Sequence, residues 1–225
     1  MPLITIFNSD GGVGKTTIAF SLAVALATDH NKRVKLIDAD PNKTSGATTL
    51  KEYRDKSEYG LSNLDVVKVN GNCREDLEAW GEINDFVIID CGGQDNTKTM
   101  LSALCASDAA YAVFSIDGIS EKFMGVMDEL IEQANDFRKM GTKDKLITGG
   151  IINKCDPTKG HKHNRDARRN LEKTSHLKPL NQSLTLYRAP YTEVTKEGAG
   201  ISEVDHEKAN FEMNRLIKET CGKWL

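Results

Sequence analysis

Residues 9–17, Ser-Asp-Gly-Gly-Val-Gly-Lys-Thr-Thr, have the composition of a loop that binds phosphate groups. Its three glycines carry no Cβ, so the backbone N–H groups can curl around an anion. Lys15 can reach the β- and γ-phosphates of a nucleotide, and the Thr16 hydroxyl is placed to bind Mg²⁺. The nucleotide-binding residues predicted from this loop are Gly11, Gly12, Val13, Gly14, Lys15, Thr16 and Thr17.

The sequence on either side of this loop supports the same interpretation. An apolar run over 3–7 precedes the loop, and an alanine-rich helical pattern begins at Thr16. A strand, a glycine loop and a helix in this order form the context that a phosphate-binding loop requires. The amino end of the helix adds its partial positive charge. We therefore expect the chain to bind a nucleoside triphosphate rather than to form an ordinary glycine turn here.

Acidic residues follow two further predicted strands. Asp38 and Asp40 end the second strand in Leu-Ile-Asp-Ala-Asp-Pro, and Asp90 ends the fourth in Ile-Ile-Asp-Cys-Gly-Gly. A carboxylate beside a phosphate loop can orient a water for attack on the γ-phosphate or hold a Mg²⁺-bound water. The alternative is that these acids only solvate turns. Their order along the chain favours a shared site with the loop.

The elements that must position these residues alternate between strand and helix. The pattern predicts a doubly wound α/β fold, in which a mostly parallel sheet carries helices on both faces and ligands bind beyond the carboxyl ends of the strands. Predicted strands cover 3–7, 33–37, 65–69, 85–89, 109–114, 145–152 and 183–187. Predicted helices cover 16–29, 45–56, 73–80, 97–106, 120–140, 162–175 and 204–222.

Composition sets the broad class. The 225 residues, 39% hydrophobic and 28% charged, suffice for one domain over 1–225, and a net charge of −3 makes no general argument for nucleic acid. No apolar run approaches the roughly 18 residues of a membrane span, and no signal peptide is visible. The five cysteines are scattered, which favours reduced thiols. We expect a soluble cytoplasmic protein.

Three motifs together resemble the ParA/MinD ATPases. The compressed loop G-G-x-G-K-T-T is similar to their deviant Walker A motif, 38–41 to their D-x-D-P switch I segment, and 88–94 to their Walker B and switch II segment. The resemblance implies a P-loop fold that hydrolyses ATP with Mg²⁺. By this resemblance, Asp40 positions the attacking water, and Thr16, Asp38 and Asp90 bind the metal. The catalytic residues it implies are Lys15, Asp38 and Asp40.

The chain departs from this family at one functional position. Members usually carry a signature lysine before the first glycine, and in the family this lysine reaches the partner's phosphates across a dimer interface. Here the position is Asp10, which cannot neutralise phosphate. The ATP-dependent homodimer that the resemblance implies is therefore left open.

The identity of the base depends on a second short motif. Asn153-Lys154-Cys155-Asp156 matches the guanine-recognition pattern N-K-x-D, whereas ParA-like proteins commonly use an asparagine at this place to contact adenine. The resemblance of the other motifs favours ATP over GTP, and Asn153 is the candidate base contact for either. Pro190, in Arg188-Ala189-Pro190-Tyr191, matches a family loop that flanks the base.

Residues 154–178 are basic although the whole chain is not, with eight Lys or Arg against three acids. Helical spacing brings four of them close to one face, where they could neutralise DNA phosphates without reading sequence. In ParA proteins non-specific DNA binding maps to basic residues of the carboxyl-terminal half. The alternative is an ordinary solvated helix face. The predicted DNA-binding residues are Arg165, Arg168, Arg169 and Lys173.

The leading hypothesis is a short ParA-type partition ATPase without an amino-terminal DNA-reading domain. ATP would favour a DNA-binding, nucleoid-associated form, and a centromere-binding ParB-like adaptor would stimulate hydrolysis. The last helix is nearly charge-balanced, unlike the basic membrane-binding helix of MinD-like relatives, so we expect no membrane contact. Two alternatives stay open: a nucleotide-dependent adaptor in conjugation or cell positioning with little turnover, and an ATP-dependent small-molecule ligase or synthetase.

Overall fold

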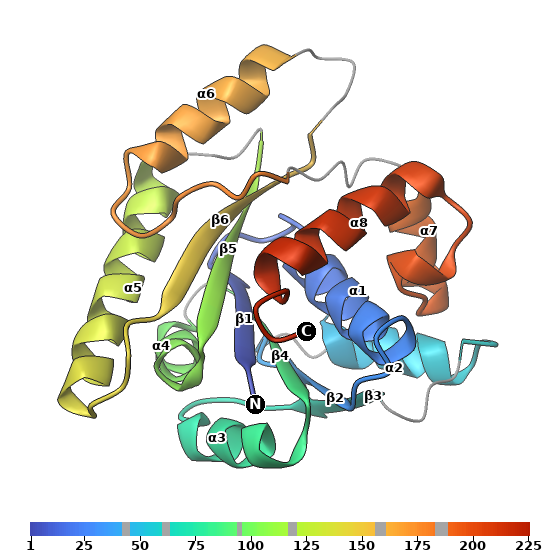
Figure 1. Cartoon of the computed structure of the whole chain (residues 1–225), viewed down its shortest axis with the longest axis horizontal. Helices are drawn as coiled ribbons and strands as arrows, with labels where there is room; N and C mark the ends of the chain where they lie inside the picture. The colour runs from blue at the N-terminus through green and yellow to red at the C-terminus, as the bar shows by residue number, and fades with distance from the viewer. Residues whose placement is uncertain (42–45, 60–63, 94–95, 117–120, 156–160, 183–188) are drawn as a thin grey trace.

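A six-stranded, all-parallel sheet organises the computed structural model (Figure 1). The structure describes residues 1–41, 46–59, 64–93, 96–116, 121–155, 161–182 and 189–225. The strand order is β3-β2-β4-β1-β5-β6, so the phosphate loop after β1 opens at the centre of the sheet. The strands are β1 (Leu3–Asn8), β2 (Val34–Asp38), β3 (Leu64–Lys68), β4 (Phe86–Gly92), β5 (Ala109–Ser115) and β6 (Ile147–Asn153).

Helices cover both faces of this sheet, as Figure 1 shows. One face carries α1, α2, α7 and α8, and the other carries α3, α4, α5 and α6. The helices are α1 (Lys15–Thr28), α2 (Ala47–Asp55), α3 (Arg74–Ile83), α4 (Thr97–Ala106), α5 (Glu121–Met140), α6 (His161–Glu172), α7 (Ala189–Glu197) and α8 (Glu207–Thr220), with a short 3₁₀ helix η1 (Ile201–Glu203) between the last two.

The apolar character of the strands follows from this double cover. In β1, Ile4 and Ile6 pack toward α1, while Leu3 and Phe7 pack into the core on the opposite face. Every residue of β1, β2 and β4 is buried. A parallel strand that is buried on both faces reads as a continuous apolar run rather than as an alternating one.

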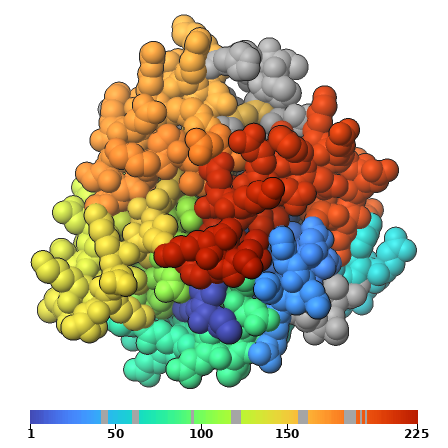
Figure 2. All heavy atoms as spheres, in the orientation of Figure 1, coloured from blue at the N-terminus to red at the C-terminus, as the bar shows by residue number. Residues whose placement is uncertain are grey.

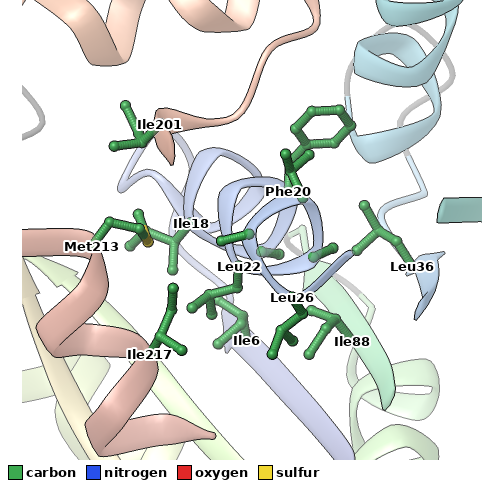
Figure 3. Close-up of a cluster of buried hydrophobic side chains, with 14 of the residues drawn as sticks. Ile6, Ile18, Phe20, Leu22, Leu26, Leu36, Ile88, Ile201, Met213 and Ile217 are labelled. Carbon is green, nitrogen blue, oxygen red and sulfur yellow. The ribbon is translucent and has the colours of Figure 1, made fainter. Parts of the chain in front are cut away.

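Helix α1 lies at the centre of the larger core. Figure 3 shows Ile18, Leu22 and Leu26 of α1 between the sheet and the carboxyl-terminal elements. Residues 18–27 of α1 are all buried, so the helix is apolar around most of its circumference. The helix that begins at the phosphate loop is thereby fixed on all sides. The labelled neighbours are Ile6, Leu36, Ile88, Ile201, Met213 and Ile217.

The predicted α/β fold is confirmed, and the first six predicted strands match the six observed ones. The predicted strand over 183–187 lies outside the described residues. Helix α7 was not predicted, because its nine residues begin with Ala-Pro and end beside a glycine pair, and such short segments look like loops. Figure 2 shows α6 on the molecular surface at one end of the protein, while α8 crosses the same view near its middle.

Candidate nucleotide-binding site

A cleft of about 730 Å³ lies at the carboxyl end of the central strands. Its size is within the range of small-molecule sites, and its walls come from the phosphate loop and from the segments after β2 and β4. These are the three regions that the sequence motifs single out. The lining residues are Ser9, Gly11, Gly12, Gly14, Lys15, Thr16, Thr17, Asp40, Pro41 and Gly93.

The glycines of the phosphate loop are needed for its backbone path. Gly12 has φ 69° and Gly14 has φ 99°, in the left-handed region that side chains rarely adopt. Gly14 is the N-cap of α1 and provides no side-chain hydrogen bond to the first turn. The first N–H groups of α1 are therefore without a side-chain cap at the point where an anion would bind.

Two buried asparagines hold the loop in place. Asn8 donates to the Val113 carbonyl on β5 at 2.7 Å, and its Oδ1 accepts the Asp10 N–H at 2.9 Å. Asn153, at the end of β6, donates to the Val13 carbonyl at 2.6 Å. No sequence motif singled out Asn8. Asn153 is fully buried against the loop, and its contact with a base stays a prediction.

Lys15 is a buried cation in the cleft, with 6% of its surface exposed. Its Nζ donates to the Asp10 carbonyl at 2.6 Å. Burial lowers the pKa of Lys15, while the nearby Asp90, Asp40 and Asp10 carboxylates oppose that shift. The ammonium group therefore lies among negative charges that favour its charged form and is placed to meet phosphate oxygens.

The strand register brings the Asp38 and Asp90 carboxylates together. These residues are direct neighbours at the ends of β2 and β4. Asp38 is fully buried and accepts backbone N–H groups from Thr48 at 2.9 Å and Asp40 at 3.2 Å. The Lys68 ammonium lies 3.8 Å from it. Asp38 thus contacts the amino end of α2 and lies next to Asp90.

Asp90 differs because neither of its buried carboxylate oxygens has a hydrogen bond from the described residues. Burial raises the pKa of Asp90 to about 7, with further increases from Asp38 and Asp40, while the approach of the Thr16 hydroxyl and Lys15 lowers it. An unpartnered buried carboxylate of this kind is costly unless a cation or a proton neutralises it.

These features fit a Mg²⁺ ion. Asp90 supplies unpartnered oxygens, and the Thr16 hydroxyl lies beside them. Within the described part of the chain, no three His, Cys, Asp or Glu residues converge into a site of their own. Mg²⁺ is usually bound by one or two protein groups together with nucleotide phosphates, so the pair is suited to a metal that arrives with its nucleotide.

The segments after β2 and β4 pack tightly against each other. A Cβ on Gly93 would lie 2.9 Å from the Pro41 Cδ, so only glycine fits there. The buried Asn96 amide donates to the carbonyls of Ala39 at 2.7 Å and Gly92 at 2.9 Å. Asn96 therefore ties the two segments that flank Asp40. No sequence signal singled it out.

The other predicted site residues lie elsewhere. Pro190 lines a separate cleft of about 570 Å³ between α7 and the start of α8, and the lining of the phosphate cleft does not include it. Two of the predicted DNA-binding residues, Arg165 and Arg169, are exposed on α6, and Lys173 is exposed directly after its last residue. Arg168 instead donates to the carbonyls of Leu180 at 2.8 Å and Asn181 at 2.5 Å. Among the described helices, none has the length and apolarity needed to cross a membrane.

The family of the chain follows from comparison with known proteins. Residues 4–195 match the CobQ/CobB/MinD/ParA nucleotide binding domain. The sporulation initiation inhibitor protein Soj of Bacillus subtilis is 29% identical over 194 residues, which cover 68% of this chain and 73% of Soj. ATPase GET3 of Phaeosphaeria nodorum is 35% identical over 115 residues, which cover 49% of this chain and 32% of GET3. The chain thus spans about a third of GET3.

Solved structures agree on the fold. Apo McdA from Cyanothece superposes with a TM-score of 0.70 at 20% identity, covering 97% of this chain and 99% of McdA. Three findings indicate a nucleotide-binding domain: the family match over most of the sequence, the phosphate loop, and the neighbouring carboxylates of β2 and β4. The chain therefore belongs to the CobQ/CobB/MinD/ParA family of nucleotide-binding domains and is related to its ParA- and MinD-type ATPases.

Proposed function

We propose that this chain is a ParA-like ATPase that binds and hydrolyses Mg-ATP to drive or regulate the partition or positioning of DNA. The observation that carries the proposal is the phosphate cleft, which Lys15 and Asp40 line together with the glycine loop. The unpartnered Asp90 carboxylate is buried next to Lys15 and Thr16. The relation to the partition protein ParA of Caulobacter vibrioides, 29% identical over 161 residues, supports the cellular role.

Each residue of the cleft has a distinct part in this reaction. The loop N–H groups and Lys15 bind the phosphates and neutralise charge that develops on the γ-phosphate. Thr16 and Asp90 would hold Mg²⁺, which would supply further charge neutralisation, with Asp38 next to Asp90 on the neighbouring strand. Asp40 lines the cleft and orients the attacking water. Asn96 holds the backbone of Ala39, directly before Asp40, and that of Gly92 at the end of β4.

DNA binding in this proposal belongs to the exposed charges near α6. Arg165, Arg169 and Lys173 face solvent and can contact phosphates of any sequence. Arg168 supports the same surface by holding the chain at 180–181. A ParB-like adaptor would stimulate hydrolysis, and the active form would be nucleoid-associated in the cytoplasm.

The experiment that tests the enzymatic role is Asp40→Ala. ATP affinity, measured with a fluorescent analogue, should remain within about twofold, while turnover falls by roughly 100-fold or more because general-base catalysis is lost. Asp136→Ala, which removes an exposed carboxylate on α5, is the matched control and should change neither quantity. Equal loss of binding and turnover in Asp40→Ala would contradict the assigned role.

Asp10 favours a second candidate, a nucleotide-dependent adaptor with little turnover. A carboxylate near a partner's triphosphate would repel it, so the sandwich dimer of the family is disfavoured. Sedimentation of Asp40→Ala in Mg-ATP and Mg-ADP separates the two functions. A dimer in ATP alone, tightened by Asp10→Lys, supports the ATPase switch. Monomers in both nucleotides, with ATP bound, support the adaptor.

A further inference from the structure

Helix α2 connects the candidate magnesium site to a turn near the carboxyl end of the chain. The helix follows the switch I segment and covers Ala47–Asp55, about 13 Å at 1.5 Å per residue. Both of its ends contact buried charged groups. Neither the sequence motifs nor the phosphate cleft accounts for the group at its carboxyl end.

The amino end of α2 contacts Asp38. The Thr48 N–H donates to Asp38 Oδ2 at 2.9 Å. A Cβ on the preceding Gly46 would lie 2.6 Å from the same oxygen, so the backbone approaches the carboxylate as closely as glycine allows. The first turn of α2 contains no acidic residue of its own, and Asp38 supplies the negative charge that a helix amino terminus favours. A shift of α2 would therefore move the groups that orient Asp38.

The carboxyl end of α2 is held by Arg54, whose side chain is 1% exposed. Its two terminal nitrogens grip Glu203 in a bidentate pair at 2.8 and 2.7 Å, and Nη1 also donates to the Gly198 carbonyl at 2.8 Å. Glu203 in turn accepts the Gly200 N–H at 2.8 Å. The guanidinium group thus binds the turn between α7 and η1 from inside the core.

Backbone packing reinforces this second contact. Gly198 has φ 69°, and a Cβ there would lie 2.2 Å from the Arg54 backbone nitrogen. The turn and the last turn of α2 therefore touch main chain to main chain. A buried ion pair is weak evidence for net stability, because the cost of removing both charges from water offsets much of their attraction. Removing only one partner is destabilising, because the other charge then stays buried without compensation. A role in positioning fits this balance better than a role in stability alone.

We propose that Arg54 is a positioning residue for the magnesium-binding edge of the site. By anchoring the carboxyl end of α2, it keeps the Thr48 N–H at the amino end in contact with Asp38. This inference rests on the proposed function, because it assumes that Asp38 belongs to the Mg²⁺ shell. It adds that the turn at 198–203 and the nucleotide site are connected by one rigid helix. A displacement of that turn is then transmitted to Asp38.

Two variants test the connection. Glu203→Gln keeps the shape of the pair and removes its charge, and Arg54→Lys keeps the charge and removes the bidentate grip. The matched control is Lys51→Met, which breaks the exposed Lys51–Asp55 pair on the same helix without touching the turn. Should Arg54→Lys fail to fold, Glu203→Gln carries the test.

The first readout needs no nucleotide. Amide hydrogen exchange at Thr48, six residues before Arg54 on α2, should speed up by about tenfold in both variants and not in Lys51→Met. The second is the Mg²⁺ concentration needed to tighten ATP binding, which should rise by about tenfold, the usual cost of losing an indirect support of a metal ligand. ATP affinity without Mg²⁺ should stay unchanged.

The possible results distinguish failure of the proposed function from failure of the role assigned to Arg54. Wild-type protein whose ATP binding ignores Mg²⁺ would overturn the proposed function itself. Wild-type protein that responds to Mg²⁺, with variants that respond identically and protect Thr48 equally well, would overturn only the role of Arg54. Lower thermal stability alone in Glu203→Gln, with both readouts unchanged, would likewise show that Arg54 is purely structural.

Discussion

The phosphate cleft and the basic surface of α6 both carry positive charge, but the protein holds that charge in different ways. Lys15 is 6% exposed, donates to a backbone carbonyl and lies among three carboxylates. Arg165 and Arg169 are exposed to solvent. A buried charge has a defined position and a strong local field, whereas exposed charges are screened by salt. The buried charge of the cleft is therefore suited to chemistry, and the exposed charges of α6 are suited to the DNA contact proposed above.

The largest effect is expected from Gly92→Ala, which tests whether the position of the buried Lys15 is needed for ATP binding. The new Cβ would lie 2.2 Å from the Lys15 Cε, so the lysine must move while the fold can stay intact. Displacing one charge-assisted contact of about 3 kcal/mol should weaken ATP binding by roughly 100-fold. A fluorescent-nucleotide titration measures this effect.

Gly125→Ala is the matched control for that substitution. Gly125 lies within α5, and a Cβ there meets nothing within 4 Å. The change should leave nucleotide binding alone and raise stability by up to about 1 kcal/mol, since alanine favours helix over glycine. Unchanged ATP affinity in Gly92→Ala would show that the position of Lys15 matters less than we infer.

The next effect is a pH dependence that belongs to Asp90. Its folded pKa of about 7 lies above the ordinary 3.8, so the folded protein keeps a proton that the unfolded chain has lost between those values. The stability that this proton contributes is present at low pH and is lost as pH rises through 7. Mg²⁺ must displace the same proton, so its binding should weaken by up to tenfold per pH unit below about 7.

Mg²⁺ titrations of ATP binding at pH 6, 7 and 8 measure that dependence. Asp90→Asn cannot titrate, so its profile reports only the protonation of the nucleotide and of other groups. The difference between the two profiles should have its midpoint near pH 7. Parallel profiles for wild type and Asp90→Asn would contradict the assignment.

The smallest effects are expected on α6, where two adjacent arginines form a natural pair of tests. Arg169→Ala removes an exposed charge, so the salt dependence of DNA binding should flatten by about 0.9 in slope without a change in stability. Arg168→Ala removes hydrogen bonds to two carbonyls and should lower the free energy of unfolding by about 1–2 kcal/mol. Electrophoretic mobility shifts at several salt concentrations and urea unfolding provide the readouts. Identical DNA behaviour of Arg169→Ala and wild type would remove α6 from the DNA surface.

The sequence was sufficient for the architecture because the strands are short apolar runs buried on both faces, and the loop motif fixes which end of the sheet binds ligand. It could not supply α7, whose Ala-Pro start and glycine-rich end resemble a loop. Asn8, Asn96 and Arg54 were also beyond its reach. Their partners, Val113, Ala39 and Glu203, lie 57 to 149 residues away along the chain, and no local pattern marks such contacts.

The most direct test of the account is a calorimetric titration of ATP at pH 8, with Mg²⁺ and with a chelator, on wild-type protein and Asp90→Asn. We predict that wild-type protein binds ATP and that Mg²⁺ tightens the binding. Asp90→Asn should bind ATP alone equally well and gain little from Mg²⁺. Absence of ATP binding by wild-type protein, or equal tightening in both proteins, would contradict this prediction.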